Sequence, residues 1–220
     1  MTISSDDPRP VEAVVFDFGG VFTASPFASL MAVAEAQSLD PLTMVGVMFG
    51  PYDQDTDHPW HQLERGEITL DAATARIVEL AAAEGVDGFE PMEMLMALGG
   101  GGVRAEVVEF CRTVRSRGFR TGLLTNNARE FEEFWVPLLP LDELFDDVVD
   151  SSAVGLRKPD PRIYELSLER LGVAAAAAVF VDDAPGNVVG AQAVGMRGVL
   201  IGMEPDDVAV ALAEIESHLA

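Results

Sequence analysis

Several short apolar segments of the chain are followed by side chains that could bind a metal ion or a phosphoryl group. Carboxylate oxygens suit a hard divalent cation such as Mg²⁺, whereas a hydroxyl and an ammonium group suit phosphoryl oxygens. Lys158 stands out among them, because it is the only lysine among the fourteen basic residues. The candidate residues are Asp17, Thr125, Asn126, Lys158, Asp182 and Asp183.

The elements before these residues alternate between strand and helix patterns. Short β-branched runs predict buried strands in VEAVVF, RTGLLT, DDVVD and AVFV, with GVLIG as a fifth. Helical patterns follow at 103–117, 159–171 and 186–194. This alternation predicts an α/β fold with a doubly wound parallel sheet. Ligands of such sheets bind beyond the carboxyl ends of the strands, where the candidate residues would meet.

One interval interrupts the alternation. Residues 23–102 show helical patterns at 27–38, 70–84 and 91–98 but no convincing strand, and the interval is too long for a crossover. We expect an inserted helical subdomain at 23–102 and an α/β core formed by 11–22 and 103–220. Within the insertion, His61 and Arg65 are four residues apart and would share a helix face. With Trp60 they could close over a phosphorylated sugar, although a solvated helix edge explains them nearly as well.

The composition of the chain argues against several classes of partner and of structure. Thirty-seven acidic against fourteen basic residues give a net charge of −23, which would repel a nucleic-acid backbone. No apolar run approaches the roughly 20 residues of a membrane span, and the first residues lack the pattern of a signal peptide, so a cytoplasmic location is expected. The single cysteine, Cys111, excludes an intrachain disulfide and a zinc site built from several thiolates. The sequence does not indicate an oligomeric state.

The segments VVFDFGGVF, LLTNN, GLRKPDPRIY and VFVDDAPGN resemble, in this order, the four motifs of the haloacid dehalogenase superfamily of hydrolases. Most members of that superfamily are Mg²⁺-dependent phosphatases. The resemblance covers residues 11–202 and implies that the helical insertion is the family's cap. It is closest to the capped branch that holds glucose-1-phosphate phosphatases and the phosphatase domain of soluble epoxide hydrolases, which share a segment similar to WHQLERGEI.

The resemblance implies a role for each motif residue. Asp17 would be the nucleophile and would form an aspartyl-phosphate. Asp17, the backbone carbonyl of Gly19 and the carboxylate of Asp183, with Asp182 beside it, would hold Mg²⁺.

The remaining motif residues would act on the phosphoryl group. Thr125 and the backbone amide of Asn126 would bind it, and Lys158 would neutralise its charge. A lysine suits this position because its ammonium group is a compact charge that a planar guanidinium would not reproduce. The implied substrate is a small phosphorylated metabolite.

Gly19 departs from the superfamily pattern. Most of the phosphatases carry a second aspartate there, two residues after the nucleophile, as the general acid and base, a contribution of roughly 10²–10⁴-fold. Substrates whose leaving oxygen needs little protonation, such as anomeric or acyl phosphates, would suffer least from its loss.

Two other functions compete with the phosphatase. A 2-haloacid dehalogenase would use Asp17 and would not miss an acid at Gly19, because a halide leaves without a proton; dehalogenases, however, do not need the metal that Asp182 and Asp183 would bind. A catalytically silent protein could retain the phosphate and metal sites for binding alone. The intact Asp17, Lys158 and Asp183 argue against such a loss of function.

Overall fold

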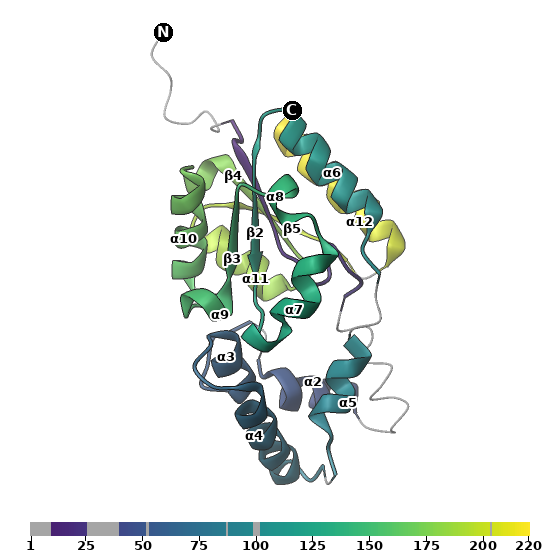
Figure 1. Cartoon of the computed structure of the whole chain (residues 1–220). Helices are drawn as coiled ribbons and strands as arrows, with labels where there is room; N and C mark the ends of the chain where they lie inside the picture. The colour runs from purple at the N-terminus through teal and green to yellow at the C-terminus, as the bar shows by residue number, and fades with distance from the viewer. Residues whose placement is uncertain (1–9, 26–39, 52, 87, 99–101, 203) are drawn as a thin grey trace.

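The computed structural model describes residues 10–25, 40–51, 53–86, 88–98, 102–202 and 204–220. Their centre is a five-stranded sheet with the order β3-β2-β1-β4-β5, in which every neighbouring pair is parallel (Figure 1). This confirms the predicted doubly wound α/β fold, including its fifth strand. The strands are β1 (Ala13–Phe16), β2 (Arg120–Thr125), β3 (Asp147–Asp150), β4 (Ala178–Asp182) and β5 (Arg197–Leu200).

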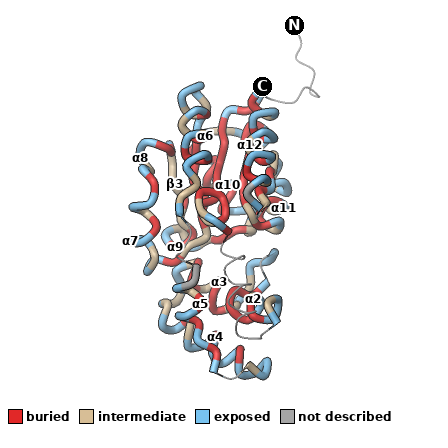
Figure 2. Tube along the Cα trace, turned by 90° about the vertical axis from the view of Figure 1, so that its right-hand side faces the viewer, coloured by how far each residue is buried: buried red, intermediate tan, exposed pale blue. Residues whose placement is uncertain are grey.

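Helices cover both faces of the sheet, which explains why β1 and β4 are fully buried and apolar apart from the terminal Asp182. On β1, Val14 and Phe16 pack into one hydrophobic cluster with helices α6 (Ala105–Ser116) and α12 (Pro205–Leu219). The alternate residues Ala13 and Val15 pack into a second cluster with α10 (Pro161–Leu171) and α11 (Pro185–Ala193). Figure 2 shows the result, with buried strands inside helices whose outer surfaces are exposed.

The ends of α10 follow from local chemistry. The side chain of Asp160 accepts a hydrogen bond from the backbone N–H of Arg162, and Gly172 ends the helix in the left-handed conformation at φ 66°. Because Asp160 is the N-cap, the helix begins at Pro161, two residues later than the predicted start at 159. Lys158 and Pro159 therefore lie in the loop before the helix.

In the described residues between β1 and α6 lie the helices α2 (Pro41–Phe49), α3 (Pro59–Glu64), α4 (Leu70–Ala83) and α5 (Pro91–Leu98). They form a helical insertion beyond one end of the sheet (Figure 1) and share a hydrophobic cluster that includes Met44, Leu63 and Ile77 and is joined by Ala128 of the core. The helices predicted at 70–84 and 91–98 are confirmed, whereas the one at 27–38 lies outside the described residues. Helix α2 was not predicted, because its sequence PLTMVGVMF is apolar on nearly every side.

Shorter elements complete the core. They are the helices α7 (Glu132–Trp135), α8 (Leu141–Leu144) and α9 (Ser151–Val154) and the 3₁₀ turns Arg129–Phe131, Val136–Leu138 and Ala175–Ala177. An antiparallel bridge between Thr23 and Val103 joins the two chain segments that connect the core to the insertion.

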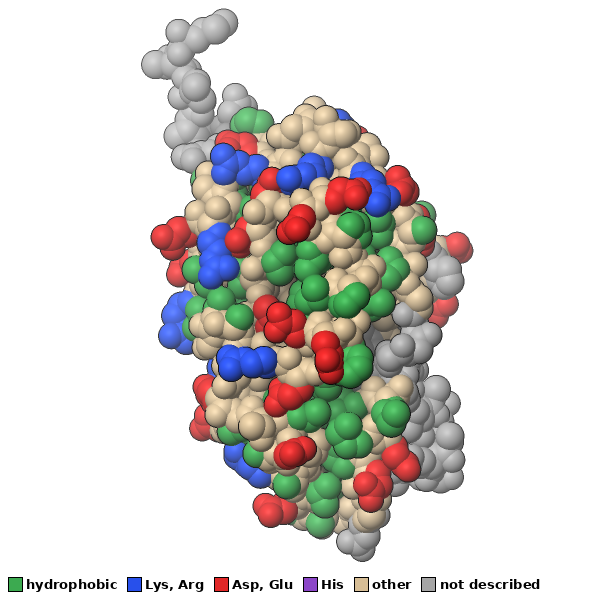
Figure 3. All heavy atoms as spheres, viewed as in Figure 1, with side chains coloured by type: hydrophobic (Ala, Val, Ile, Leu, Met, Phe, Trp, Pro, Cys, Tyr) green, Lys and Arg blue, Asp and Glu red, His purple; other side chains and the backbone are tan. Residues whose placement is uncertain are grey.

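Among the described residues, no helix combines the length and the apolar character that a membrane span requires. On the face shown in Figure 3, acidic side chains are spread over both the core and the insertion, in keeping with the net charge of −23.

Candidate active site

The carboxyl ends of β1 and β4 bring three aspartates together. Phe16 of β1 is the register partner of Val181 of β4, and the backbone N–H of Asp17 donates to the carbonyl of Val181 at 2.9 Å. Asp17 therefore lies beside Asp182 and Asp183. One carboxylate oxygen from each aspartate lies within 4.8 Å of the other two.

Lys158 lies among these carboxylates. Its Nζ is 2.7 Å from Oδ1 of Asp17 and 2.7 Å from Oδ2 of Asp182, and its side chain is fully buried. Burial alone would lower the pKa of Lys158, but the two neighbouring carboxylates outweigh it and raise that pKa. The lysine is therefore a fixed positive charge at the end of the sheet.

Asp182 and Asp183 differ in what their oxygens contact. Besides Lys158, Asp182 accepts hydrogen bonds from the backbone N–H of Ala184 at 2.8 Å and from Nδ2 of Asn187 at 3.1 Å to each oxygen. Asp183 is half-buried and accepts a hydrogen bond at 2.7 Å from the hydroxyl of Ser25. The donors around Asp182 satisfy both of its oxygens, so Asp183 is the aspartate with oxygen left for a metal ion.

The electrostatics of the cluster favour a cation. Burial, together with the neighbouring carboxylates of Asp182 and Asp183, raises the pKa of Asp17 to about 8, although Lys158 opposes the shift. Burial and Asp182 likewise raise the pKa of Asp183 to about 7. A divalent cation between these carboxylates would offset both effects. Buried oxygen ligands of this kind fit Mg²⁺.

Thr125 and Asn126 lie at the carboxyl end of the neighbouring strand, β2. Thr125 ends β2, which pairs with β1, and its side chain is buried. The side chain of Asn126 contacts the main chain of Lys158 in both directions: Oδ1 accepts from its N–H at 2.8 Å and Nδ2 donates to its carbonyl at 3.0 Å. Sequence reasoning considered only the backbone amide of Asn126 and missed this contact.

Gly19 and Gly20, which follow Asp17, differ in the space available for a side chain. A β-carbon on Gly19 would have no heavy atom within 4 Å. Gly20 has a φ of +73°, and a β-carbon there would overlap the carboxylate of Asp183. Gly20 is therefore required where it stands, whereas the space at Gly19 is open to a side chain.

The structure does not bring His61 and Arg65 into this cluster. His61 is fully buried on α3, its Nδ1 accepts from the backbone N–H of Thr56 at 3.0 Å, and burial together with Arg157 lowers its pKa to about 3. Arg65 follows the end of α3 and forms ion pairs with Asp55 and Glu67. Both side chains are engaged within the insertion, so they are not included in the site proposed below.

Three further contacts of the site were not predicted from the sequence. Asn187 lies five residues after Asp182, within the motif VFVDDAPGN, so its spacing was a usable signal. Tyr164 donates through its hydroxyl to the carbonyl of Asn187 at 2.8 Å and so supports that loop. For Ser25, which lies 158 residues from Asp183 in sequence, no local pattern predicted the contact.

A family model described as haloacid dehalogenase-like hydrolase matches residues 11–195. The chain belongs to this family of hydrolases. The sesquiterpene phosphatase astK of Aspergillus oryzae is 31% identical to this hydrolase over 198 residues, which cover 86% of this chain and 88% of the relative. Mouse acyl-CoA dehydrogenase family member 10 is 29% identical over 96% of this chain, but the chain spans only 19% of that protein.

Solved structures share the fold. An L-2-haloacid dehalogenase superposes with a TM-score of 0.66 at 21% identity, covering 94% of this chain and all of that one (100%). A haloacid dehalogenase family enzyme from Bacteroides thetaiotaomicron, in complex with magnesium and inorganic phosphate, superposes with a TM-score of 0.58 at 17% identity, covering 89% of this chain and 96% of that one. At these identities the similarity establishes the architecture of this hydrolase and leaves its substrate open.

Proposed function

We propose that this hydrolase is a Mg²⁺-dependent phosphatase that acts on small phosphorylated metabolites, sugar phosphates among them, through an aspartyl-phosphate on Asp17. The observation that carries the proposal is the convergence of Asp17, Lys158 and Asp183 at the carboxyl end of the sheet. Phosphoryl transfer depends mainly on positioning and on stabilising negative charge, which such a cluster provides. The phosphatase among its relatives supports the same reaction class.

In the proposed reaction, a carboxylate oxygen of Asp17 attacks phosphorus, and the bond to the leaving oxygen breaks as the new bond forms. Water then attacks the phosphorus of the aspartyl-phosphate, which releases inorganic phosphate and regenerates Asp17. Lys158 stabilises the charge on Asp17 and on the phosphoryl oxygens. Thr125 and the backbone N–H of Asn126 would orient those oxygens.

The residues that would hold Mg²⁺ are Asp17, Asp183 and the backbone carbonyl of Gly19. Mg²⁺ would supply positive charge for the phosphoryl oxygens. Asp182 instead fixes the ammonium group of Lys158, because its two oxygens already accept hydrogen bonds from that group, Ala184 and Asn187. Asp182 is therefore a positioning residue in this proposal.

The glycine at position 19 narrows the expected substrates. Asp17, Asp182 and Asp183 surround the reacting position with carboxylates, but the expected proton donor two residues after the nucleophile is absent. The leaving oxygen would depart with more negative charge, so anomeric, aryl and acyl phosphates should react faster than simple alkyl phosphates.

The helical insertion is proposed to act as a cap over this site, with residues 11–22 and 103–220 as the catalytic core. Its hydrophobic cluster, which takes in only Ala128 and Phe131 from the described core residues, and its place beyond one end of the sheet support this division. A cytoplasmic location is proposed from the sequence alone.

The experiment is a panel of phosphorylated metabolites and para-nitrophenyl phosphate, assayed with Mg²⁺ and with excess chelator. We expect turnover that chelation abolishes and Mg²⁺ restores, and none from Asp17→Asn. Full activity in excess chelator would refute the proposal. Metal-independent halide release from 2-chloropropionate would establish the dehalogenase instead, and phosphate binding without any turnover would establish a silent binding protein.

A further inference from the structure

Arg157, the residue before the proposed catalytic lysine, is fully buried where the core meets the helical insertion. Its Nε donates to Oε2 of Glu64 on α3 at 2.7 Å, and its Nη1 donates to the carbonyl of Gln54 at 2.9 Å. Glu64 is itself buried, and its other oxygen accepts from Nε1 of Trp60 at 2.9 Å. The guanidinium of a core residue is thus bound by partners from the insertion.

Lys158 is held just as firmly on the other side. Asn126 binds its backbone N–H and carbonyl, while Asp17 and Asp182 bind its ammonium group. The two consecutive side chains therefore have different partners: the guanidinium of Arg157 contacts the insertion, and the ammonium group of Lys158 contacts the carboxylates of the active site. A displacement of α3 relative to the core would act on Arg157 and, across one peptide unit, on Lys158.

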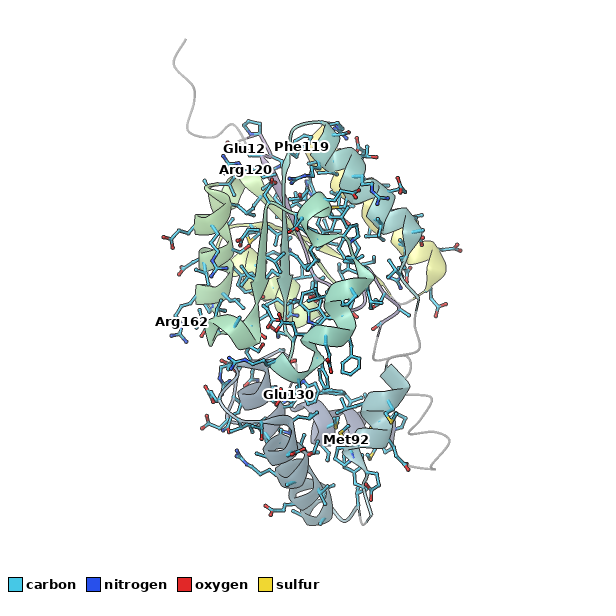
Figure 4. All side chains as sticks on the ribbon, in the orientation of Figure 1. Glu12, Met92, Phe119, Arg120, Glu130 and Arg162 are labelled. Carbon is cyan, nitrogen blue, oxygen red and sulfur yellow. The ribbon has the colours of Figure 1, made fainter. Side chains whose placement is uncertain are left out.

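Other contacts join the insertion to the core without burying a pair of charges: Ala128 of the core packs in the hydrophobic cluster of the insertion, and two further contacts involve the main chain. The backbone N–H of Leu70 donates to the exposed carboxylate of Glu130 at 2.9 Å; Glu130 is labelled in Figure 4, where the core meets the insertion. A β-carbon on Gly66 would lie 2.5 Å from the carbonyl oxygen of Ser152. The Arg157–Glu64 pair is different, because it removes two full charges from water.

Stability alone gives a weak reason for such a pair. Replacing a buried ion pair by uncharged side chains of similar volume is often neutral or stabilising, because desolvation offsets the attraction between the charges. What the ion pair does provide is geometry, since a guanidinium fixed by two acceptors has little freedom.

We propose that Arg157 is a positioning residue that ties helix α3 of the insertion to Lys158 and so holds the lysine against Asp17. The proposal rests on the role of Lys158 in the proposed function. A displacement of about 1 Å of a catalytic group can cost about 10²-fold in rate, so the tie would act on kcat more than on KM.

The test uses the double variant Arg157→Met with Glu64→Gln. It removes both charges, keeps similar volumes and leaves an acceptor for Trp60, so we expect its Tm to stay within a few degrees of the parent. Turnover of para-nitrophenyl phosphate with Mg²⁺ should lose about 10- to 100-fold in kcat, with KM changed by less than about threefold. Arg76→Met is the matched control, because Arg76 lies on α4 and donates to Gln62 within the insertion.

A second readout does not depend on turnover. Lys158 is the only lysine, so an amine-reactive acetylating reagent followed by peptide mass spectrometry reports its accessibility directly. The parent and Arg76→Met should be protected, and the double variant should be modified about fivefold faster or more at a temperature where all three are folded.

Parent-like labelling together with parent-like kcat in the double variant would overturn the proposal and leave the pair a structural feature only. A loss of kcat that merely follows a loss of Tm would overturn it as well. If the parent hydrolyses no phosphate ester, the proposed function fails, while the labelling still decides whether Arg157 positions Lys158.

Discussion

Two buried cations are adjacent in the sequence, Lys158 and Arg157, and their surroundings differ in charge balance. Lys158 is surrounded by the carboxylates of Asp17, Asp182 and Asp183, so negative charge exceeds positive. Arg157 pairs with the buried carboxylate of Glu64 and with a neutral carbonyl, while Asp55, 3.7 Å from its guanidinium, is also paired with Arg65. Both regions exclude water, yet only the first lacks the positive charge that its carboxylates require.

The carboxylates around Lys158 are suited to binding a cation, whereas the paired charges of Arg157 and Glu64 are suited to fixing the position of the chain. Around Lys158, burial and the neighbouring carboxylates of Asp182 and Asp183 raise the pKa of Asp17 to about 8 against the opposing effect of Lys158, and a cation or a change of protonation must compensate for it. Around Arg157 the charges are matched, and a neutral His61 packs nearby with its pKa lowered to about 3 by burial and by that guanidinium.

Lys158→Arg should have the largest effect. A guanidinium is bulkier than an ammonium group and spreads its charge, and the lysine lies 2.7 Å from two carboxylates with no exposed surface. We expect kcat for para-nitrophenyl phosphate to fall about 10²- to 10³-fold while the protein stays folded by circular dichroism. Parent-like turnover would show that the type of cation does not matter at this position.

Gly20→Ala should follow, with Gly19→Ala as its matched control. The added methyl group at position 20 overlaps the carboxylate of Asp183 and forces a non-glycine residue to φ +73°, whereas at position 19 it meets open space. We expect Gly20→Ala to raise the Mg²⁺ concentration needed for half-maximal activity about tenfold or more and to lower Tm by several degrees. Equal behaviour of the two variants would contradict the assigned role of Asp183.

Gly19→Asp should change substrate preference. The open space at position 19 admits a carboxylic acid two residues after Asp17, where it could protonate the leaving oxygen. We expect alkyl phosphates to react about 10- to 100-fold faster than with the parent and aryl phosphates to change little. The measurement is a series of esters graded in leaving-group pKa, and an unchanged slope would show that some other group already supplies the proton.

The pH dependence of stability should show the smallest effect. The pKa of Asp17 is raised from 3.8 to about 8 by folding, so the folded state favours the protonated form. Its contribution to stability is present below about pH 4 and is lost as the pH rises toward 8. In metal-free protein, Tm of the parent minus Tm of Asp17→Asn should therefore fall between pH 5 and 9. A difference that rises over this range would contradict the assignment.

The sequence was sufficient to predict the residues at the strand ends. Buried β-branched runs followed by Asp17, Thr125 and Asp182 predict a parallel sheet whose carboxyl ends meet, and the structure places these residues there. The lone lysine pointed to the same place. Such predictions succeed because a short segment contains both the pattern of a buried strand and the polar residue that follows it.

Contacts between distant segments could not be predicted in this way. The Arg157–Glu64 bond joins residues 93 positions apart, and no local pattern reveals it. The spacing of His61 and Arg65 indicated a shared helix face, but α3 spans only six residues and Arg65 falls after its end. His61 is buried because both the insertion and Arg157 pack around it, which depends on tertiary structure rather than on helical period.

Trapping the aspartyl-phosphate would show whether Asp17 is the nucleophile. The protein is mixed with Mg²⁺ and a saturating aryl phosphate, quenched in acid within the first turnovers and reduced with borohydride, which converts an aspartyl-phosphate into homoserine. Peptide mass spectrometry should find homoserine at position 17, dependent on both Mg²⁺ and substrate. Phosphate release accompanied by reduction at another carboxylate, such as Asp183, with residue 17 intact would contradict the account.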